Sequence, residues 1–491
     1  MNTIINFSDS LAPSTITKII VDKFKNSDSI KMIRTADNYY SVNNEEINTK
    51  SSTYYDRDRK PHNNPNASNV KIKSNFLRML VQQKKDYGFS KPFIFLLSDE
   101  NENEIELDDN EYGKEWNKFL KKQLFDKISS VAGLAINHGI SWVYLWIDDD
   151  GELNIKELSA EYVYPIWKDT QHDDLNRLVY NYQIEKYNSS SPETKEYAEY
   201  WDDDTIIIFD VDDYTQVVVN TDSEGNPMNY HMTDGEEGVS WGKIPFVAFK
   251  GTDDEMPILS FVKEYIDAYD KLASRSVDTL IDELDPLLIF KGISPEFTSL
   301  LEAREVAKLT KTMALDTDGD ARYITTQSIV AQYLERMSNL KSDIIKFGYG
   351  VDFDDVRFGG NPNQMVIQSL YQNLDTYMDG LERQFQKFIN NLKYFFDRWY
   401  ELMGKGSFDE VKRYTIKVKL DKSMMINNSS MIDDTVKLSG TGISKKTILE
   451  FNPIVQDVDL EMERIEEERR KEMEDNDLFD FTSQQKELTD E

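Results

Sequence analysis

The sequence predicts an α+β fold in which a mixed first half is followed by long helices. Three observations support this prediction. Apolar residues recur at helical spacing before residue 139, alternate at strand spacing over residues 140–220, and return to helical spacing from residue 257 onward. At 491 residues the chain exceeds what one hydrophobic core usually accommodates, so we expect about two to four packed units.

The composition limits the possible functions. A formal net charge of −33 disfavours a protein that holds nucleic acid through a basic surface. This charge is compatible with simple solubility, and also with the wall of a channel along which DNA slides, because like charges repel over a Debye length of roughly 8 Å. The chain has no cysteine, which excludes disulfides, cysteine nucleophiles and thiolate metal sites.

Neither a leader peptide nor a membrane span is predicted. The first ten residues, MNTIINFSDS, lack the basic start and the apolar core of a signal peptide. The longest apolar run, PFIFLL at residues 92–97, is far shorter than a membrane-spanning helix.

The first half is expected to combine helices with short strands. Helical spacing covers residues 14–24, 71–87 and 111–138. A hairpin is predicted over residues 140–158, with its turn at Asp150–Gly151. Further strands are expected over residues 178–186, 196–201, 205–210 and 215–220.

The second half contains two helices with matching apolar stripes. The first, over residues 257–284, begins with Pro257, a residue favoured in the first helical turn. The second covers residues 328–347. The stripe residues expected to pack the two helices together are Val262, Tyr265, Tyr269, Leu272, Val330, Tyr333, Met337, Leu340 and Ile344.

The segments around this helix pair are predicted as follows. The insert at residues 287–327 contains a strand, a helix and a turn into ARYITT. The loop at residues 348–363 is longer than the usual connection of about 2–8 residues between helices, which favours a function for it. A long helix over residues 362–403 follows, with a break expected near Gly380, then one strand over residues 408–420 and tail helices at 429–438, 444–450 and 460–474.

The acidic clusters are the only candidate metal sites. Asp316, Asp318 and Asp320 resemble the start of a calcium loop, but Ala321 stands where the turn glycine belongs. The runs Asp202–Asp204 and Asp253–Glu255 are candidates for a two-metal phosphodiester site, although no histidine or lysine accompanies them at a recognised spacing. Solvated turns are the alternative interpretation of all three. No nucleotide site, catalytic residue or cofactor is predicted.

Four segments in order resemble the portal (head-to-tail connector) proteins of tailed bacteriophages, in particular the siphophage type. They are NFLRMLVQQKKDYGFSKP, IPFVAFKGTDDEMPILSFVKEYIDAYDKLASRSVDTLIDELDPLLIFKG, DFDDVRFGGNPNQMVIQSLYQNLD and GISKKTILEFNPIVQDVDLEMERIEEE. The second carries the family's polar pattern at Tyr265–Ser274 and Asp278. The third departs from the family, which often has Ser-Gly where this chain has Pro362 and Asn363. The resemblance covers the chain from about residue 75 onward.

The resemblance implies a portal-type fold with named parts. These are an α/β wing at residues 1–256, stem helices at 257–284 and 328–347, a small α/β clip at 285–327, a tunnel loop at 348–363, the wing's long kinked helix and strand at 364–427, and a helical crown with an acidic tail at 428–491.

The resemblance also implies a function and partners. We expect a dodecameric ring at one capsid vertex, through which double-stranded DNA is packaged, retained and ejected. The terminase large subunit, a head-completion adaptor, and the major capsid and scaffolding proteins are the expected partners, in the host cytoplasm during assembly and then in the virion. A metal-dependent nuclease or phosphoryl-transfer enzyme is the alternative.

Two sets of residues follow from the family organisation. The tunnel-loop residues expected at the DNA channel are Val351, Asp352, Phe353, Asp354, Asp355, Val356, Arg357, Phe358, Gly359, Gly360 and Asn361. Lys291, Lys308 and Lys311 of the clip are candidate contacts for DNA or the packaging motor, with a solvated helix face as the alternative.

Overall fold

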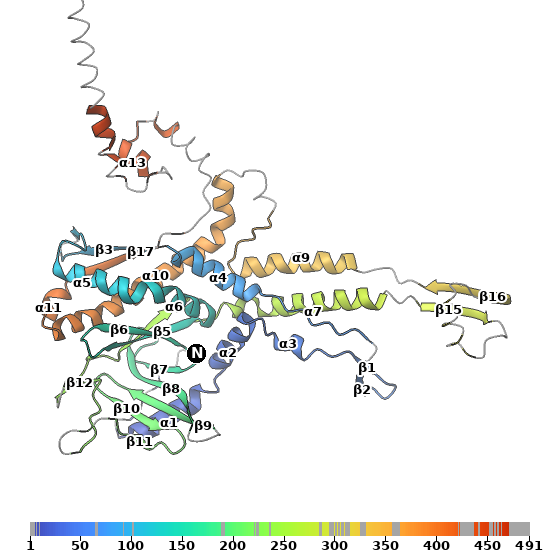
Figure 1. Ribbon diagram of the computed structural model, residues 1–491, viewed down its shortest axis with the longest axis horizontal. Helices are drawn as coiled ribbons and strands as arrows, with labels where there is room; N and C mark the ends of the chain where they lie inside the picture. The colour runs from blue at the N-terminus through green and yellow to red at the C-terminus, as the bar shows by residue number, and fades with distance from the viewer. Residues whose placement is uncertain are drawn as a thin grey trace, which may run out of the picture. The chain divides into compact units, whose positions relative to one another are not determined.

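The computed structural model describes most of the chain between residues 5 and 470 (Figure 1). The described parts are residues 5–187 and 192–283 without 6, 9, 64–66, 92, 101–102, 220, 222–224 and 235–236, residues 287–293, 315–324, 330–355, 364–420 and 422, and scattered positions within 299–309 and 437–470. The chain divides into two compact units. One comprises residues 1–350 and 377–422, and the other comprises residues 351–376 and 423–491.

The first unit begins with helices α1 (Pro13–Phe24), α2 (Asp28–Tyr40) and α3 (Glu45–Asn48). Residue Ser27 caps α2, because its side chain accepts a hydrogen bond from the Ile30 N–H. Strands β1 (Thr53–Tyr55) and β2 (Pro61–Asn63) then form an antiparallel pair. The helix predicted at residues 14–24 is confirmed, whereas α2 has no counterpart among the predicted helices.

Two larger sheets carry the strand-rich part of this unit. Strands β5 (Ile140–Ile147) and β6 (Leu153–Ser159) form the predicted hairpin, and β14 (Phe246–Lys250) pairs with the other edge of β5. The five-stranded sheet has the order β11-β10-β9-β8-β7, and every neighbouring pair is antiparallel. Its strands are β7 (Val163–Trp167), β8 (Leu175–Tyr187), β9 (Pro192–Trp201), β10 (Ile206–Asp210) and β11 (Gln216–Val217). A small pair, β12 (Met232–Asp234) and β13 (Glu237–Val239), follows.

Helix α1 and both larger sheets share one hydrophobic core. Ile16 and Ile20 of α1 pack in a buried cluster with Trp142 of β5 and with Val179 and Trp201 of the five-stranded sheet. Burial of these large apolar side chains supplies the main driving force for docking the helix on the sheets.

The helix predicted over residues 111–138 is interrupted. It consists of α5 (Glu111–Phe119), a π-helical turn at Leu120–Leu124 and α6 (Phe125–His138). The inserted turn shifts the helix register, so that Trp116, Leu120, Leu124 and Ile128 are all buried. Before it lie α4 (Phe76–Phe89) and strands β3 (Ile94–Ser98) and β4 (Glu104–Ile105). The start of α4 is five residues later than predicted, and β3 was not predicted as a strand.

The strand predicted over residues 408–420 is wrong in its first half. Residues Phe408–Val411 form the short helix α11, and only Thr415–Lys419 form strand β17. Strand β17 pairs with β3, far away in sequence, and Ile416 and Val418 point into the core while Thr415, Lys417 and Lys419 are exposed. The apparent alternation before Tyr414 belongs to a helix whose Val411 alone is buried.

Helix α10 (Gln364–Leu402) continues through Gly380, so the expected break in helical structure is absent there. Its part in the first unit, residues 377–402, carries a row of buried rings. Phe385 packs against Phe89, Phe93 and Phe249 at ring-centroid distances of 5.4, 5.4 and 5.7 Å. Phe396 contacts Trp116 of α5 edge-on at 4.8 Å. These rings join α10 to α4, α5 and β14 in one core.

The second unit is described in fewer residues. It includes the first turns of α10 at residues 364–376 and helix α13 (Lys445–Glu450). Ser444 caps α13, because its Oγ accepts a hydrogen bond from the Thr447 N–H at 3.2 Å. Residues 437–439, 461–462 and 464–470 are also helical, while most of the remaining predicted crown lies outside the described residues.

None of the helices in the described part of the chain is long and apolar enough to cross a membrane.

Candidate functional site: the helix pair and the loop that follows it

The two stripe-bearing helices are α7 (Leu259–Glu283) and α9 (Val330–Phe347), and they pack side by side (Figure 1). Tyr265 near the start of α7 contacts Phe347 at the end of α9, with ring centroids 5.2 Å apart, so the helices run antiparallel. Pro257 precedes α7 by two residues instead of lying in its first turn. Both predicted helices are therefore confirmed, with slightly later starts.

The predicted stripe is only partly a contact between these two helices. Val262, Leu340 and Ile344 are buried, and Tyr265, Tyr269, Leu272, Tyr333 and Met337 are half-buried. Tyr269 packs edge-on against Phe76 of α4 at 4.9 Å, so this residue docks α7 on α4 rather than on α9. Val330 lies at the start of α9, and its side chain is outside the described residues.

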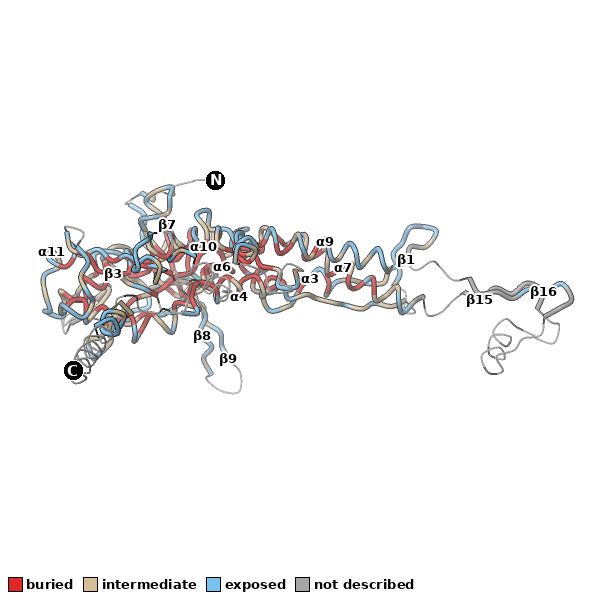
Figure 2. Tube along the Cα trace, turned by 90° about the horizontal axis from the view of Figure 1, so that it is seen from above, coloured by how far each residue is buried: buried red, intermediate tan, exposed pale blue. Residues whose placement is uncertain are grey.

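Exposure increases toward the ends of α7 and α9 that connect to the insert (Figure 2). Three large apolar side chains lie there in water. Leu280 and Ile281 of α7 are each 47% exposed, and Leu334 of α9 is 60% exposed. Exposed apolar side chains gathered on one region of a protein are typical of an interaction surface.

The insert contains an antiparallel pair, β15 (Leu287–Ile293) and β16 (Leu315–Ile324). Lys291 lies in β15 opposite Asp320, while Lys308 and Lys311 lie outside the described residues. Residues Asp316, Asp318 and Asp320 belong to the extended strand β16, which is unlike the compact turn of a calcium loop.

Three polar side chains in a row on α7 bind the backbone of residues 70–74. Asp270, Ser274 and Asp278 repeat every four residues, so they lie on one face. They bind the backbone N–H groups of Ser74, Ile72 and Val70, at 2.9, 3.0 and 2.7 Å respectively. The family-like polar pattern noted in the sequence thus has a structural role that sequence reasoning did not assign.

Acidic side chains of α7 also bind Tyr39 of α2 and Asn44, the residue that caps α3. Asn44 Nδ2 donates to Asp267 Oδ1 at 3.1 Å and to Asp270 Oδ2 at 2.9 Å, and the Tyr39 hydroxyl donates to Asp267. Lys50 reaches Asp278 Oδ2 at 2.5 Å. Burial raises the pKa of Asp270, while its hydrogen bonds with Ser74 and Asn44 oppose this rise.

Helix α9 ends in a Schellman motif that leads into the predicted tunnel loop. Tyr349 N–H donates to Lys346 O at 3.3 Å, and Gly350 N–H donates to Ile345 O at 2.8 Å. The residue in the left-handed conformation is Tyr349, with φ of 53°, where glycine is usual. Its ring contacts those of Tyr377 at 5.6 Å and Phe261 at 6.3 Å, and these contacts hold it there.

A buried lysine of α4, Lys84, contacts this motif. Lys84 is fully buried, and its Nζ donates to the carbonyl oxygens of Gly348 and, at 3.3 Å, of Leu80. It also lies 5.2 Å from the centroid of the Tyr377 ring. Burial lowers the pKa of Lys84 to about 7, because the apolar surroundings disfavour the ammonium form.

The described part of the predicted tunnel loop is a turn. Asp352 Oδ1 accepts the Asp354 N–H at 3.1 Å, and Asp352 O accepts the Asp355 N–H at 3.1 Å. Val351 is buried, whereas Phe353 is 53% exposed and lies 6.4 Å from the Tyr371 ring. The remaining candidates, Val356, Arg357, Phe358, Gly359, Gly360 and Asn361, lie outside the described residues.

The acidic clusters proposed for metal chemistry are used in turns and ion pairs. Asp202 Oδ1 accepts the backbone N–H groups of Asp204 and Thr205 at 3.1 and 2.7 Å, and Asp203 pairs with Lys168 at 3.0 Å. Asp253 accepts a hydrogen bond from Gln384 instead of joining them. Among the described residues, no three histidine or acidic side chains are grouped so that they could hold a metal ion.

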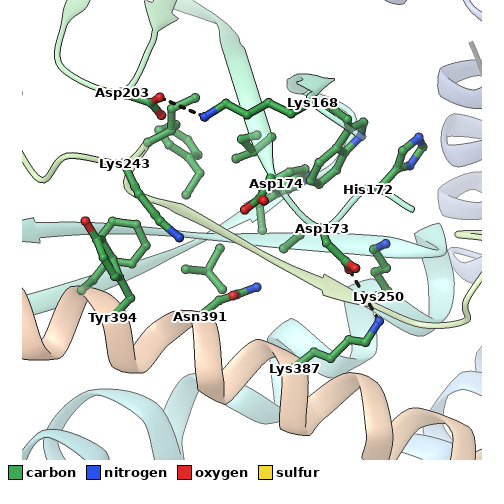
Figure 3. A pocket seen from close by; sticks show the side chains of 18 of the residues that line it. Lys168, His172, Asp173, Asp174, Asp203, Lys243, Lys250, Lys387, Asn391 and Tyr394 are labelled. Carbon is green, nitrogen blue, oxygen red and sulfur yellow. Dashed lines mark hydrogen bonds and ion pairs between the residues drawn. The ribbon is translucent and has the colours of Figure 1, made fainter. Parts of the chain in front are cut away.

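A pocket of about 160 Å³ lies between β14 and α10 (Figure 3). Its lining alternates in charge. Lys168 faces Asp203 at 3.0 Å, and Lys387 faces Asp173 at 3.5 Å. Lys243 lies 4.7 Å from the centroid of the Tyr394 ring. Because most of these cations have an acidic neighbour in the wall, the pocket has no strong preference for an anion or a cation, and we assign it no ligand.

Comparison with known proteins points to one family. Residues 23–475 match the family model described as phage portal protein, SPP1 Gp6-like. The portal protein of Bacillus phage SPP1 is 25% identical over 476 residues, covering 95% of this chain and 89% of that protein. The portal protein of Clostridium phage phiCD119 is 27% identical over 453 residues, covering 88% and 91%.

A structural likeness was also found to the neck of a native GTA particle computed with C12 symmetry. It covers 76% of this chain and 88% of that chain, with 10% identity and a TM-score of 0.42.

Proposed function

Since the chain belongs to the SPP1 Gp6-like family of phage portal proteins, we propose that it is the subunit of a ring-shaped channel at one vertex of a phage capsid. The match over residues 23–475 is the observation that carries this proposal, because it includes all the segments on which the family resemblance rests. Double-stranded DNA would pass through the ring during packaging and ejection. We propose no catalytic role for the chain, because portal proteins are structural.

The ring itself is proposed from the family organisation, with twelve copies. The exposed side chains of Leu280, Ile281 and Leu334 support it, because a neighbouring pair of stem helices would remove them from water. Twelve copies at −33 each would carry a formal charge of −396. A wall of this charge repels phosphates and lets DNA slide.

The roles of the individual parts of the subunit are also proposed. The insert that contains β15 and β16 would be the clip, which meets the terminase motor in the host cytoplasm and later the head-completion adaptor in the virion. Lys291, Lys308 and Lys311 are its candidate contacts. Capsid and scaffolding proteins would surround the remaining surface.

The loop at residues 351–361 is proposed to line the narrowest part of the channel. Asp352, Asp354 and Asp355 give it an acidic character. Asp354 is exposed, and Asp352 and Asp355 are half-buried. Repulsion between these carboxylates and the DNA backbone would guide the duplex without gripping it.

Electron microscopy of the purified protein tests the ring. Negatively stained particles are expected to show closed rings with a central hole. A population that stays strictly monomeric at all concentrations and salt conditions would refute the proposed assembly.

Deletion of residues 352–358 tests the loop. The deletion lies outside the core of the first unit, so rings are expected to form as in the wild type. Packaged DNA per capsid is expected to fall, or DNA is expected to leak from filled heads. Normal packaging and retention by the deletion variant would show that the loop is only a connection between α9 and α10.

A further inference from the structure

The fully buried Lys84 has no counter-ion. Among the residues that the structure describes, no carboxylate lies within ion-pair distance of its Nζ. The other two mostly buried lysines differ in this respect, because Lys393 pairs with Asp397 at 2.5 Å and Lys250 pairs with Glu255 at 3.2 Å. A buried ammonium without an opposite charge is unfavourable, and an apolar side chain would fill the same space at lower cost.

The contacts of Lys84 explain why a donor is needed. The Gly348 carbonyl follows the last turn of α9, where carbonyl oxygens lack partners within the helix. A cation at this end also interacts favourably with the helix dipole. The Leu80 carbonyl and the face of the Tyr377 ring complete the surroundings of the amino group.

The backbone that Lys84 contacts is unusually constrained. A Cβ atom on Gly348 would lie 2.5 Å from Leu80 Cδ1 and 2.8 Å from the Ile344 oxygen. A Cβ atom on Gly350 would lie 2.6 Å from Leu80 Cδ2 and 2.9 Å from Gln83 Oε1. Helix α4 and residues 348–350 therefore approach more closely than side chains would allow, with the strained Tyr349 between the two glycines.

We propose that Lys84 is a positioning residue, whose amino group holds the Gly348 carbonyl and thereby fixes the backbone of Gly348, Tyr349 and Gly350, from which the predicted tunnel loop begins. The proposal rests on the proposed function only for the role of that loop in the channel. The partner of the interaction is the chain's own backbone, so it is present in every copy of the subunit.

The strength of this interaction depends on protonation. The phenol ring of Tyr377 lies next to the amino group, and Tyr349 and Asp254 in turn act on Tyr377. Burial raises the pKa of Tyr377, so this ring stays neutral near pH 7 and does not stabilise the ammonium as an ion pair. On α4 itself, Lys85 is half-buried and Asp86 is exposed and bound by Gln82. Lys84 is therefore the group nearest the motif that changes charge near neutral pH.

Hydrogen–deuterium exchange of the assembled full-length protein tests the proposal. The readout is the exchange of the amides of Gly348, Tyr349 and Gly350, which donate to Ile344, Lys346 and Ile345. Lys84→Met keeps the length and the apolar stem of the side chain and removes the donor. We expect this variant to unfold cooperatively and to exchange these amides about ten-fold faster than the wild type at about pH 8, where Lys84 is mostly neutral in the folded protein. A ten-fold change is the equivalent of one lost hydrogen bond.

The pH profile separates positioning from a general packing role. After correction for intrinsic exchange, protection of these amides in the wild type is expected to rise between about pH 7 and pH 9. Burial lowers the pKa of Lys84 in the folded state, so an opening that exposes its amino group to water takes up a proton and becomes less favourable as the pH rises. Lys84→Met is expected to show no such change. Lys84→Gln, which keeps an uncharged donor, is expected to retain part of the protection without the pH dependence. Lys85→Met is the matched control and should behave as the wild type.

Equal protection of the three amides in the wild type and in Lys84→Met would overturn the proposal. So would a pH dependence that persists in Lys84→Gln. These readouts need only a folded subunit, so they are independent of whether rings form, and a failure to form rings would bear on the proposed function alone. Capsids assembled with Lys84→Met add a functional readout, with reduced DNA retention as the expected result.

Discussion

Asp270 of α7 accepts a hydrogen bond from the backbone N–H of Ser74 at 2.9 Å, across 196 residues of sequence. Ser274 and Asp278, one and two turns later, bind the N–H groups of Ile72 and Val70. An extended segment without strand partners has unpaired backbone donors, and this row supplies their acceptors. Helix α7 is thus attached to residues 70–76 by polar contacts on one face and by the contact between Tyr269 and Phe76 beside it.

Replacement of Asp270 by alanine is expected to destabilise the first unit. The substitution leaves the Ser74 N–H and one of the two N–H groups of the Asn44 amide without an acceptor in a buried place, which should lower the free energy of unfolding by about 1–3 kcal/mol. Chemical denaturation measures this change. Glu264→Ala, an exposed acid on the same helix, is the control and should shift stability by less than about 0.5 kcal/mol. Equal effects of both variants would show that the row is not a specific attachment.

Replacement of Gly348 and of Gly380 by alanine is expected to change the stability of the protein in opposite directions. At Gly348 the added Cβ meets Leu80 and the Ile344 carbonyl, so Gly348→Ala should cost about 1–3 kcal/mol. At Gly380 the nearest atom is 3.8 Å away within helix α10, so Gly380→Ala should stabilise by about 0.5–1 kcal/mol through its higher helix propensity. Thermal unfolding of both variants checks the two signs. A stabilising Gly348→Ala would mean that α4 and the end of α9 do not approach closely.

The periodicity of apolar residues predicted the elements that bury one face. It missed the elements that form only because they pair with segments far away in the sequence. The helices α7, α9 and most of α10 were evident because their apolar stripes extend over many turns. Strand β3 was missed because only its pairing with β17, more than 300 residues later, defines it. The π-helical turn at Leu120–Leu124 was missed because its period differs only slightly from that of an α-helix.

The site showed the same limits. The polar spacing of Asp270, Ser274 and Asp278 was visible as a family-like pattern, but its partners at residues 70–74 have no distinctive sequence. Lys84 was not singled out from the sequence, because sequence spacing does not reveal that its amino group is buried and bound to the Gly348 carbonyl after the last turn of α9. The signal that would have found it is the pair of glycines at 348 and 350, which marks a close approach of another element.

The pH dependence of stability is expected to report on Lys84. In the unfolded chain its pKa is the ordinary 10.5, and in the folded chain it is lowered to about 7. Between these pH values Lys84 is protonated in the unfolded chain and neutral in the folded chain. Its contribution to the free energy of unfolding therefore rises with pH, by up to about 1.4 kcal/mol per pH unit. Lys84→Met lacks this contribution. Denaturation of both proteins between about pH 7 and pH 10 should therefore show that the free energy of unfolding of the wild type rises relative to that of the variant. A constant difference would mean that Lys84 titrates normally.

A charge placed on the exposed apolar side chains of α7 and α9 is expected to prevent assembly of the proposed ring. Leu334 is 60% exposed in the isolated subunit, so Leu334→Asp should leave the unfolding free energy of the subunit within about 0.5 kcal/mol of the wild type. In a ring the same carboxylate would be buried against the neighbouring stem without a partner, which costs several kcal/mol at each of the repeated interfaces. Sedimentation velocity should then show monomers where the wild type forms rings. Gln332→Asp adds the same charge to another exposed position of α9 and is the control, with rings expected to persist. Rings formed equally well by Leu334→Asp would place the contact between neighbouring subunits elsewhere.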